Sequence, residues 1–240
     1  MSQRDWQRAD DYAFTAHLDA AQWAWEFLRR NPAYRAEWQA FDAVWRALEG
    51  AYGRPPDRDF CAWKRDPRAW VPASECAHGE CRVDHDKVLI ECALGARWGF
   101  HKFPPDPDDD DAATDARLTW RPLDETQPLV ETDDGAWLGD DPARVALGFD
   151  LSQPLPEQLE RAKRSLQVLQ RQRVKTGRVR PATVAAWRDD LQVMLRLLDA
   201  QQAGIDDARL AVVADDWSPR QQEAQGLRDG GYRMLARLRD

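Results

Sequence analysis

A periodic run of large apolar side chains follows Asn31-Pro32. Its members lie alternately four and three residues apart, and they are Tyr34, Trp38, Phe41, Trp45 and Leu48. This spacing places side chains on one face of an α-helix. Asn31 suits the cap position, Pro32 suits the first turn and Gly50 suits the end. The pattern therefore predicts an amphipathic helix with an aromatic buried face.

A second helix is predicted directly before this one. Asp19 and Gln22 have the spacing of a capping box, in which the side chain and backbone of the two residues bond reciprocally. The stretch AAQWAWEFLRR then continues to Arg30. The chain has twelve tryptophans among 240 residues, so much of its packing must depend on large aromatic groups. The first fifty residues thus predict a helical pair.

The middle of the chain is expected to form a small antiparallel sheet. Residues 51–82 are rich in proline, glycine and charge and predict mostly loop. Four later stretches have strand-like composition, at residues 87–94, 97–103, 117–123 and 144–151. In the last, apolar side chains at 145, 147, 149 and 151 alternate with small or polar ones, as in a half-buried strand. The run PPDPDDDD at 104–111 predicts a solvated loop, because proline removes donors and like charges repel.

From Pro154 onward the pattern is helical. Steps of four and three predict a helix with Leu155, Leu159, Ala162, Leu166 and Leu169 along one side. Arg161, Arg164 and Arg171 fall on the outside of that helix. A long helix is expected after Pro181, ending at Gly204, and a short one over residues 207–214. A last helix begins at Ser218-Pro219, where Ser218 and Gln221 form a capping-box pattern, and Gly230-Gly231 interrupts it.

Together these elements predict an α+β fold, mainly α. An N-terminal helical pair and a small antiparallel sheet precede a C-terminal helical domain that resembles a helix-turn-helix. We expect two domains, one formed by residues 1–150 and the other by residues 151–240.

Charge is distributed in blocks of opposite sign. Residues 101–150 carry fourteen acidic and four basic side chains, whereas residues 161–180 carry eight basic side chains and no acidic one. The basic segment can meet several DNA phosphates and release their counterions. The candidate contacts in it are Arg161, Arg164, Arg171, Arg173, Lys175, Arg178 and Arg180. Two alternatives stay open: a merely solvated helix face, or pairing with the acidic block within the chain or across an oligomer.

The last three predicted helices have the order of a helix-turn-helix. The proposed turn, DDWSP, contains no glycine, and three short helices also build many bundles that bind no DNA.

A metal site and an enzyme are the weaker interpretations. Cys76, His78, Cys81 and His85 could hold zinc, but their spacing fits no common finger, and ordinary loop residues are the simpler interpretation. The sequence has no glycine-rich phosphate loop, nucleophile elbow or helical pair of histidine ligands, so no enzyme activity and no cofactor are expected. The sparse cysteines, the absence of a signal peptide and the absence of a long apolar run predict a cytoplasmic protein with no membrane partner.

Four stretches together resemble the RovC-like transcriptional regulators, proteobacterial proteins often linked to type VI secretion or integrative conjugative elements. They are WAWEFLRRNPAYRAEW, ARWGFHKFPPDP, FDLSQPLPEQLERAKRSL and GGYRMLARL, and they occur in the family's order over most of the chain. The resemblance implies an N-terminal regulator-like domain, a C-terminal helix-turn-helix that binds double-stranded DNA, self-association into a homo-oligomer, and transcriptional activation.

The resemblance also implies further contact residues near the C-terminus. The stretches DDARLAVV and SPRQQEAQGLRDGGYR match the family's short helix and recognition-helix region, and they supply Arg209, Ser218, Arg220, Arg228 and Arg233. The sequence departs from the family here, since only twelve residues separate Trp217 from Gly230, with two cations among them. The alternative function is therefore a family member that binds no DNA and acts as an antiactivator on another transcription regulator.

Overall fold

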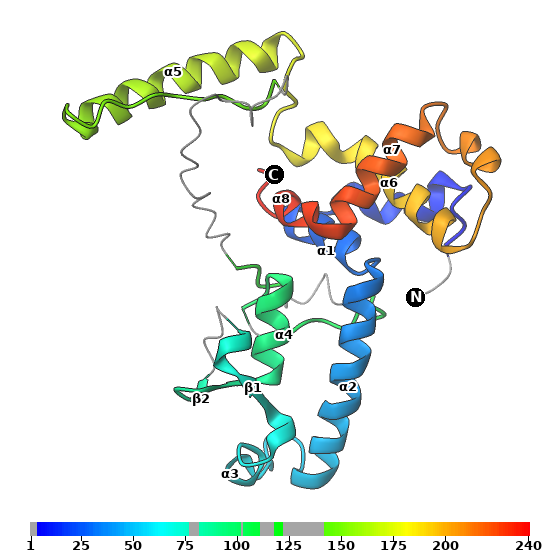
Figure 1. Cartoon of the computed structure of the whole chain (residues 1–240). Coiled ribbons are helices and arrows are strands. Elements are labelled where there is room, and N and C mark those ends of the chain that lie inside the picture. The colour runs from blue at the N-terminus through cyan, green and yellow to red at the C-terminus, as the bar shows by residue number, and fades with distance from the viewer. Residues whose placement is uncertain (1–3, 77–81, 102, 111–117, 122–141) are drawn as a thin grey trace. The chain divides into compact units, whose positions relative to one another are not determined.

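The computed structural model describes residues 4–76, 82–101, 103–110, 118–121 and 142–240 (Figure 1). These residues are mainly helical and include a three-stranded antiparallel sheet, which confirms the predicted fold class. The chain divides into two compact units: residues 1–123 with 187–240, and residues 124–186. Their bounds differ from the predicted ranges 1–150 and 151–240, and that functional division stays a prediction.

The N-terminal helical pair is confirmed. A 3₁₀ helix, η1 (Ala9–His17), precedes α1 (Ala20–Leu28), where Asp19 and Gln22 form the expected capping box. Helix α2 (Pro32–Tyr52) begins at the predicted position, because the Asn31 side chain accepts from two backbone N–H groups of the first turn. Its predicted end at Gly50 is wrong. Gly53, which has a positive φ of 84°, follows the last helical residue, and Gly50 remains inside the helix.

The sheet of the first unit has the order β1-β3-β2. Strand β1 (Trp70–Pro72) and strand β2 (Arg82–Asp84) both pair antiparallel with β3 (Lys87–Leu89). The region predicted as loop also contains α3 (Phe60–Trp63), η2 (Pro67–Ala69) and η3 (Ala73–Glu75).

The predicted strands at 87–94 and 97–103 are largely wrong. The chain leaves the sheet after Leu89 and forms α4 (Ile90–Trp98), which ends at Gly99 with φ 92°. Alanine, leucine, glutamate and arginine in this run favour a helix, and a short apolar run alone does not separate the two structures. Phe100 forms one isolated antiparallel bridge with Trp120, and residues 117, 122 and 123 of the predicted strand 117–123 lie outside the described residues.

The C-terminal helices follow the predicted order. Helix α6 (Val184–Gln202) precedes η5 (Asp207–Val212), α7 (Trp217–Gly226), a π turn (Leu227–Gly231) and α8 (Tyr232–Leu235), which packs against α1. The interruption at Gly230 is confirmed by its non-helical backbone. The Ser218 capping box is wrong: α7 begins one residue before Ser218, and Asp216 at its cap accepts from the Arg220 side chain instead.

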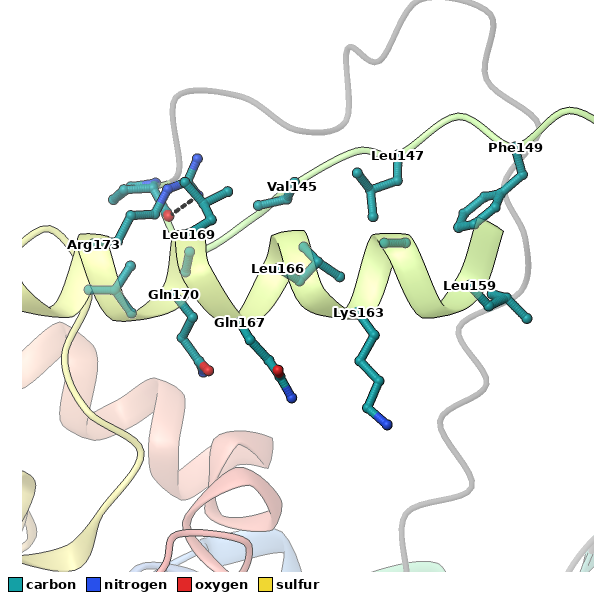
Figure 2. A pocket seen from close by; sticks show the side chains of 14 residues that line it. Val145, Leu147, Phe149, Leu159, Lys163, Leu166, Gln167, Leu169, Gln170 and Arg173 are labelled. Carbon is teal, nitrogen blue, oxygen red and sulfur yellow. Dashed lines mark hydrogen bonds between the residues drawn. The ribbon is translucent and has the colours of Figure 1, made fainter. Parts of the chain in front are cut away.

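The described part of the second unit consists mainly of α5 (Leu155–Lys175) and an extended segment at 142–150. The predicted strand at 144–151 is wrong, because none of its residues enters a ladder in the described structure. The alternation itself is real. Val145, Leu147 and Phe149 face the apolar side of α5 across a groove, so the partner of this segment is a helix rather than a sheet (Figure 2).

Candidate nucleic-acid interface

Helix α5 contains most of the basic segment and places four of its cations on one face. Arg161, Arg164, Arg171 and Lys175 are three, seven and four residues apart, which places them along one stripe of the helix. All four are exposed, and the leucine-rich stripe occupies the opposite side. The stripe extends about 21 Å at the rise of an α-helix. It is therefore long enough to follow several consecutive phosphates.

The charges of this stripe have no acidic partner in the described structure. No carboxylate of the described residues lies within ion-pair distance of its four members. The Nε groups of Arg164 and Arg171 each donate to the carbonyl four residues earlier, both at 3.2 Å. Since a carbonyl does not neutralise a guanidinium, the positive charge of the stripe faces solvent.

The other predicted cations of this segment lie differently. Arg173 donates to the carbonyls of Pro142 (2.5 Å) and Arg144 (3.2 Å), so it fastens the extended segment to α5 (Figure 2). Arg178 and Arg180 follow the helix and are exposed. Arg173 thus has a structural role that the sequence alone did not indicate.

The arginines predicted near the C-terminus have partners within the first unit. Arg220 bonds to Asp216 (2.7 Å) and to Asp190, and these bonds raise the pKa of its guanidinium. Arg228 pairs with Asp229 at 2.7 Å. Arg233 donates to the carbonyl of Arg97 at 2.8 Å and lies beside the Tyr232 ring. Two further candidates are exposed: Arg209 on η5 and Ser218 at the start of α7.

The residues of the predicted zinc set do not form a described site. Cys76 is buried in a small apolar cluster with Val88, Leu89 and Cys92, and Cys92 lies on α4. His85 is exposed and lies 2.8 Å from Asp86. His78 and Cys81 lie outside the described residues. In the part of the chain that is described, no three His, Cys, Asp or Glu side chains are placed to hold a metal ion.

A buried charge cluster in the first unit was missed at the level of sequence. Arg30 on α1's C-terminal side donates to both oxygens of Asp199 on α6, at 2.6 and 3.0 Å, and to Glu26 at 2.6 Å. The Tyr12 hydroxyl donates to the same Asp199 at 2.6 Å. Two consecutive arginines directly after the largely apolar helix α1, in FLRRN, were the available signal, because a charge buried there requires a partner.

Electrostatics keep this cluster ionised. Burial opposes the charge of Asp199, but the nearby Arg30 charge and the hydrogen bonds from Arg30 and Tyr12 lower the pKa of its carboxyl. Burial likewise opposes the charge of Arg30, and the carboxylates of Asp199 and Glu26 outweigh it and raise its pKa. Burial, followed by the neighbouring Asp199 charge, raises the pKa of the Tyr12 hydroxyl. The cluster therefore joins η1, the end of α1 and α6 with charge-assisted bonds.

The proline-rich acidic run is not simply a solvated loop. The carbonyls of three of its prolines accept from buried or half-buried donors: Pro104 from Trp38, Pro105 from Tyr34 and Pro107 from Arg29. Asp110 also pairs with Arg29, whose side chain is fully buried, at 3.0 Å. Because the backbone of the run supplies acceptors, residues 104–110 act as a strap over α1 and α2.

Comparison with known proteins supports a regulator family. Residues 5–63, which contain α1 and α2, match a family described as proteobacterial transcriptional regulator-like domain. Neither the curated proteins nor the solved structures contain a match to this chain. None of the described helices is long and apolar enough to cross a membrane. The match to a regulator-like domain suggests a regulatory rather than an enzymatic role.

Proposed function

We propose that this protein is a DNA-binding transcriptional regulator that contacts DNA phosphates through the exposed basic stripe of α5. The observation that carries the proposal is the stripe itself: Arg161, Arg164, Arg171 and Lys175 lie on one helix face without an acidic partner among the described residues. The regulator-like match of residues 5–63 supports the same role.

DNA is a better binding partner for this stripe than a single acidic side chain is. A row of fixed cations gains most from a polymer whose charges repeat along its length, since each phosphate contact releases counterions. Phosphate contacts position a protein on DNA but do not select a sequence. We propose that Arg209 and Ser218, both exposed, adjoin the duplex through a helix-turn-helix formed by α6, η5 and α7.

The RovC-like resemblance extends this proposal. On this resemblance we propose that the protein activates transcription and acts as a homo-oligomer, and its sparse cysteines favour the cytoplasm. Arg220, Arg228 and Arg233 already have intramolecular partners, so we assign them to positioning the C-terminal helices rather than to reading bases.

The test compares two triple variants of the full chain. Replacing Arg164, Arg171 and Lys175 with alanine should weaken binding to all DNA sequences alike and reduce the salt slope of log K by about three. The matched control removes three exposed arginines of the first unit, Arg8, Arg54 and Arg65, with the same change in net charge. Equal slopes for the two triple variants would contradict the proposed role of α5.

A second candidate function is favoured by one observation. The second unit exposes large apolar side chains, including Leu159 and Leu166, as expected of a protein-binding surface. If the full chain binds no DNA, capture of another transcription regulator becomes the better account.

A further inference from the structure

The apolar side of the second unit is uncovered. From Pro142 to Thr183, a range described throughout, no residue is buried. A groove of about 660 Å³ separates the extended segment from α5, with Leu147 (43 % exposed), Phe149 (40 %) and Leu159 (55 %) along it (Figure 2). A helix and an extended segment without buried side chains gain little stability alone. This surface therefore requires a cover.

The backbone of the extended segment points to the kind of cover. In the described structure, residues 145–149 make no hydrogen bond. On either side of them, Asp150 exchanges bonds with the Gln158 side chain, and the Arg144 carbonyl accepts from Arg173. In an extended chain, the N–H and C=O groups of successive residues point to opposite edges. Arg144 and Asp150 use the edge beside α5, so Val145, Leu147 and Phe149 direct theirs to the other edge.

An unpaired edge of this kind is a template for strand pairing. We propose that a second copy of this chain covers the surface by pairing its own residues 144–150 antiparallel with this edge, around a two-fold axis at Leu147. In this register Leu147 lies opposite the partner's Leu147, and Val145 lies opposite the partner's Phe149. Each of these pairs exchanges backbone hydrogen bonds, and their side chains lie over the two α5 helices.

Charge complementarity selects a second copy as the occupant. The same register places Arg144 opposite the partner's Asp150, and the symmetry repeats this pair at the other end of the ribbon. The small residues Ala146 and Gly148 lie opposite each other between the charged ends. Opposite charges and aromatic–β-branched pairs directly across an antiparallel ribbon are stabilising. The segment RVALGFD is thus complementary to itself. This pairing does not depend on DNA binding.

Disulfide trapping in the full chain tests the register. Directly opposed residues in such a pair have Cα atoms about 5.5 Å apart, within the range that a disulfide spans. Leu147→Cys should therefore form a covalent dimer under mild oxidation. The matched control is Val145→Cys on the same face. Its two copies would lie about 14 Å apart, four residues along the ribbon, and should form no dimer beyond that given by the native cysteines of the wild type.

A mixture of chains provides the second measurement. Combining Val145→Cys chains with Phe149→Cys chains should give a covalent dimer that neither variant gives alone. The wild-type chain should sediment as a dimer or a multiple of it at micromolar concentration. A monomeric wild type would overturn the proposal, as would Leu147→Cys dimers no more abundant than those of the wild type. Equal trapping of Val145→Cys alone would overturn it too, because it requires a different register.

Discussion

Replacing Asp199 with alanine tests how the buried charge cluster holds α6 to the N-terminal helices. The substitution removes the acceptor of two Arg30 bonds, at 2.6 and 3.0 Å, and of the Tyr12 hydroxyl bond at 2.6 Å. Arg30 is 5 % exposed, so its charge cannot regain water easily. Removing one partner of a buried ion pair costs roughly 3–5 kcal/mol. Since Arg30 keeps Glu26 at 2.6 Å, we expect the lower end, about 3 kcal/mol.

Urea denaturation, followed by tryptophan fluorescence and circular dichroism, measures this loss. The control is Tyr12→Phe, which removes a single charge-assisted hydrogen bond to the same carboxylate and should cost about 1.5–3 kcal/mol. Asp199→Ala should cost more than Tyr12→Phe, because it removes the Arg30 bonds as well as the Tyr12 bond. A loss below about 1 kcal/mol for Asp199→Ala, with an unchanged denaturant slope, would refute a stabilising role for the cluster.

Two further predictions concern pH and backbone packing. The pKa of Asp199 is lower in the folded chain than its ordinary value of 3.8. The stabilisation by this carboxylate is therefore present above pH 3.8 and is lost as the pH falls through the folded pKa. The difference in unfolding free energy between wild type and Asp199→Ala should shrink between pH 7 and pH 3, and a constant difference would contradict this prediction. Gly231→Ala places a Cβ 3.0 Å from Leu227 Cδ2 and 3.1 Å from the Gly226 carbonyl oxygen. This crowding should lower the free energy of unfolding by about 1–3 kcal/mol. Gly226→Ala, at a helical position with nothing within 4 Å, should be neutral or stabilising by roughly 0.5–1 kcal/mol, and equal losses for both alanines would count against the packing argument.

The helices could be predicted because their signals are local. The Asp19 capping box and the Asn31-Pro32 start act within one turn, and both are present in the structure. The leucine spacing likewise predicted α5 and its apolar face, although no residue of this helix is buried. The predicted sheet was less accurate, because short apolar runs such as 87–94 suit a helix as well as a strand. Tertiary contacts then decided that only Lys87–Leu89 joins the sheet.

Some of the candidate functional residues could also be predicted from local spacing, and others could not. Spacing alone placed Arg161, Arg164 and Arg171 on the outside of α5, away from the leucines. The roles of Arg173 and Arg220 depend on partners distant in sequence, Pro142 and Asp190, which no local pattern reveals. The strap at 104–110 could not be predicted either, because its carbonyls accept from side chains more than sixty residues earlier in the sequence. The composition of this run predicted a solvated loop, whereas its three prolines are buried in the structure.

Fluorescence anisotropy of labelled duplex DNA with the full chain measures whether the protein binds DNA through phosphate contacts. The C-terminal residues 187–240 pack in one unit with residues 1–123, so the measurement requires the intact protein rather than a fragment. At salt concentrations of about 50 and 200 mM, phosphate-driven binding should fall steeply. If the protein is a DNA-binding regulator, it should bind DNA at about 50 mM salt and bind more weakly at about 200 mM. This should hold for random DNA and for the region upstream of its own gene. No binding at either salt, on either DNA, would contradict the account.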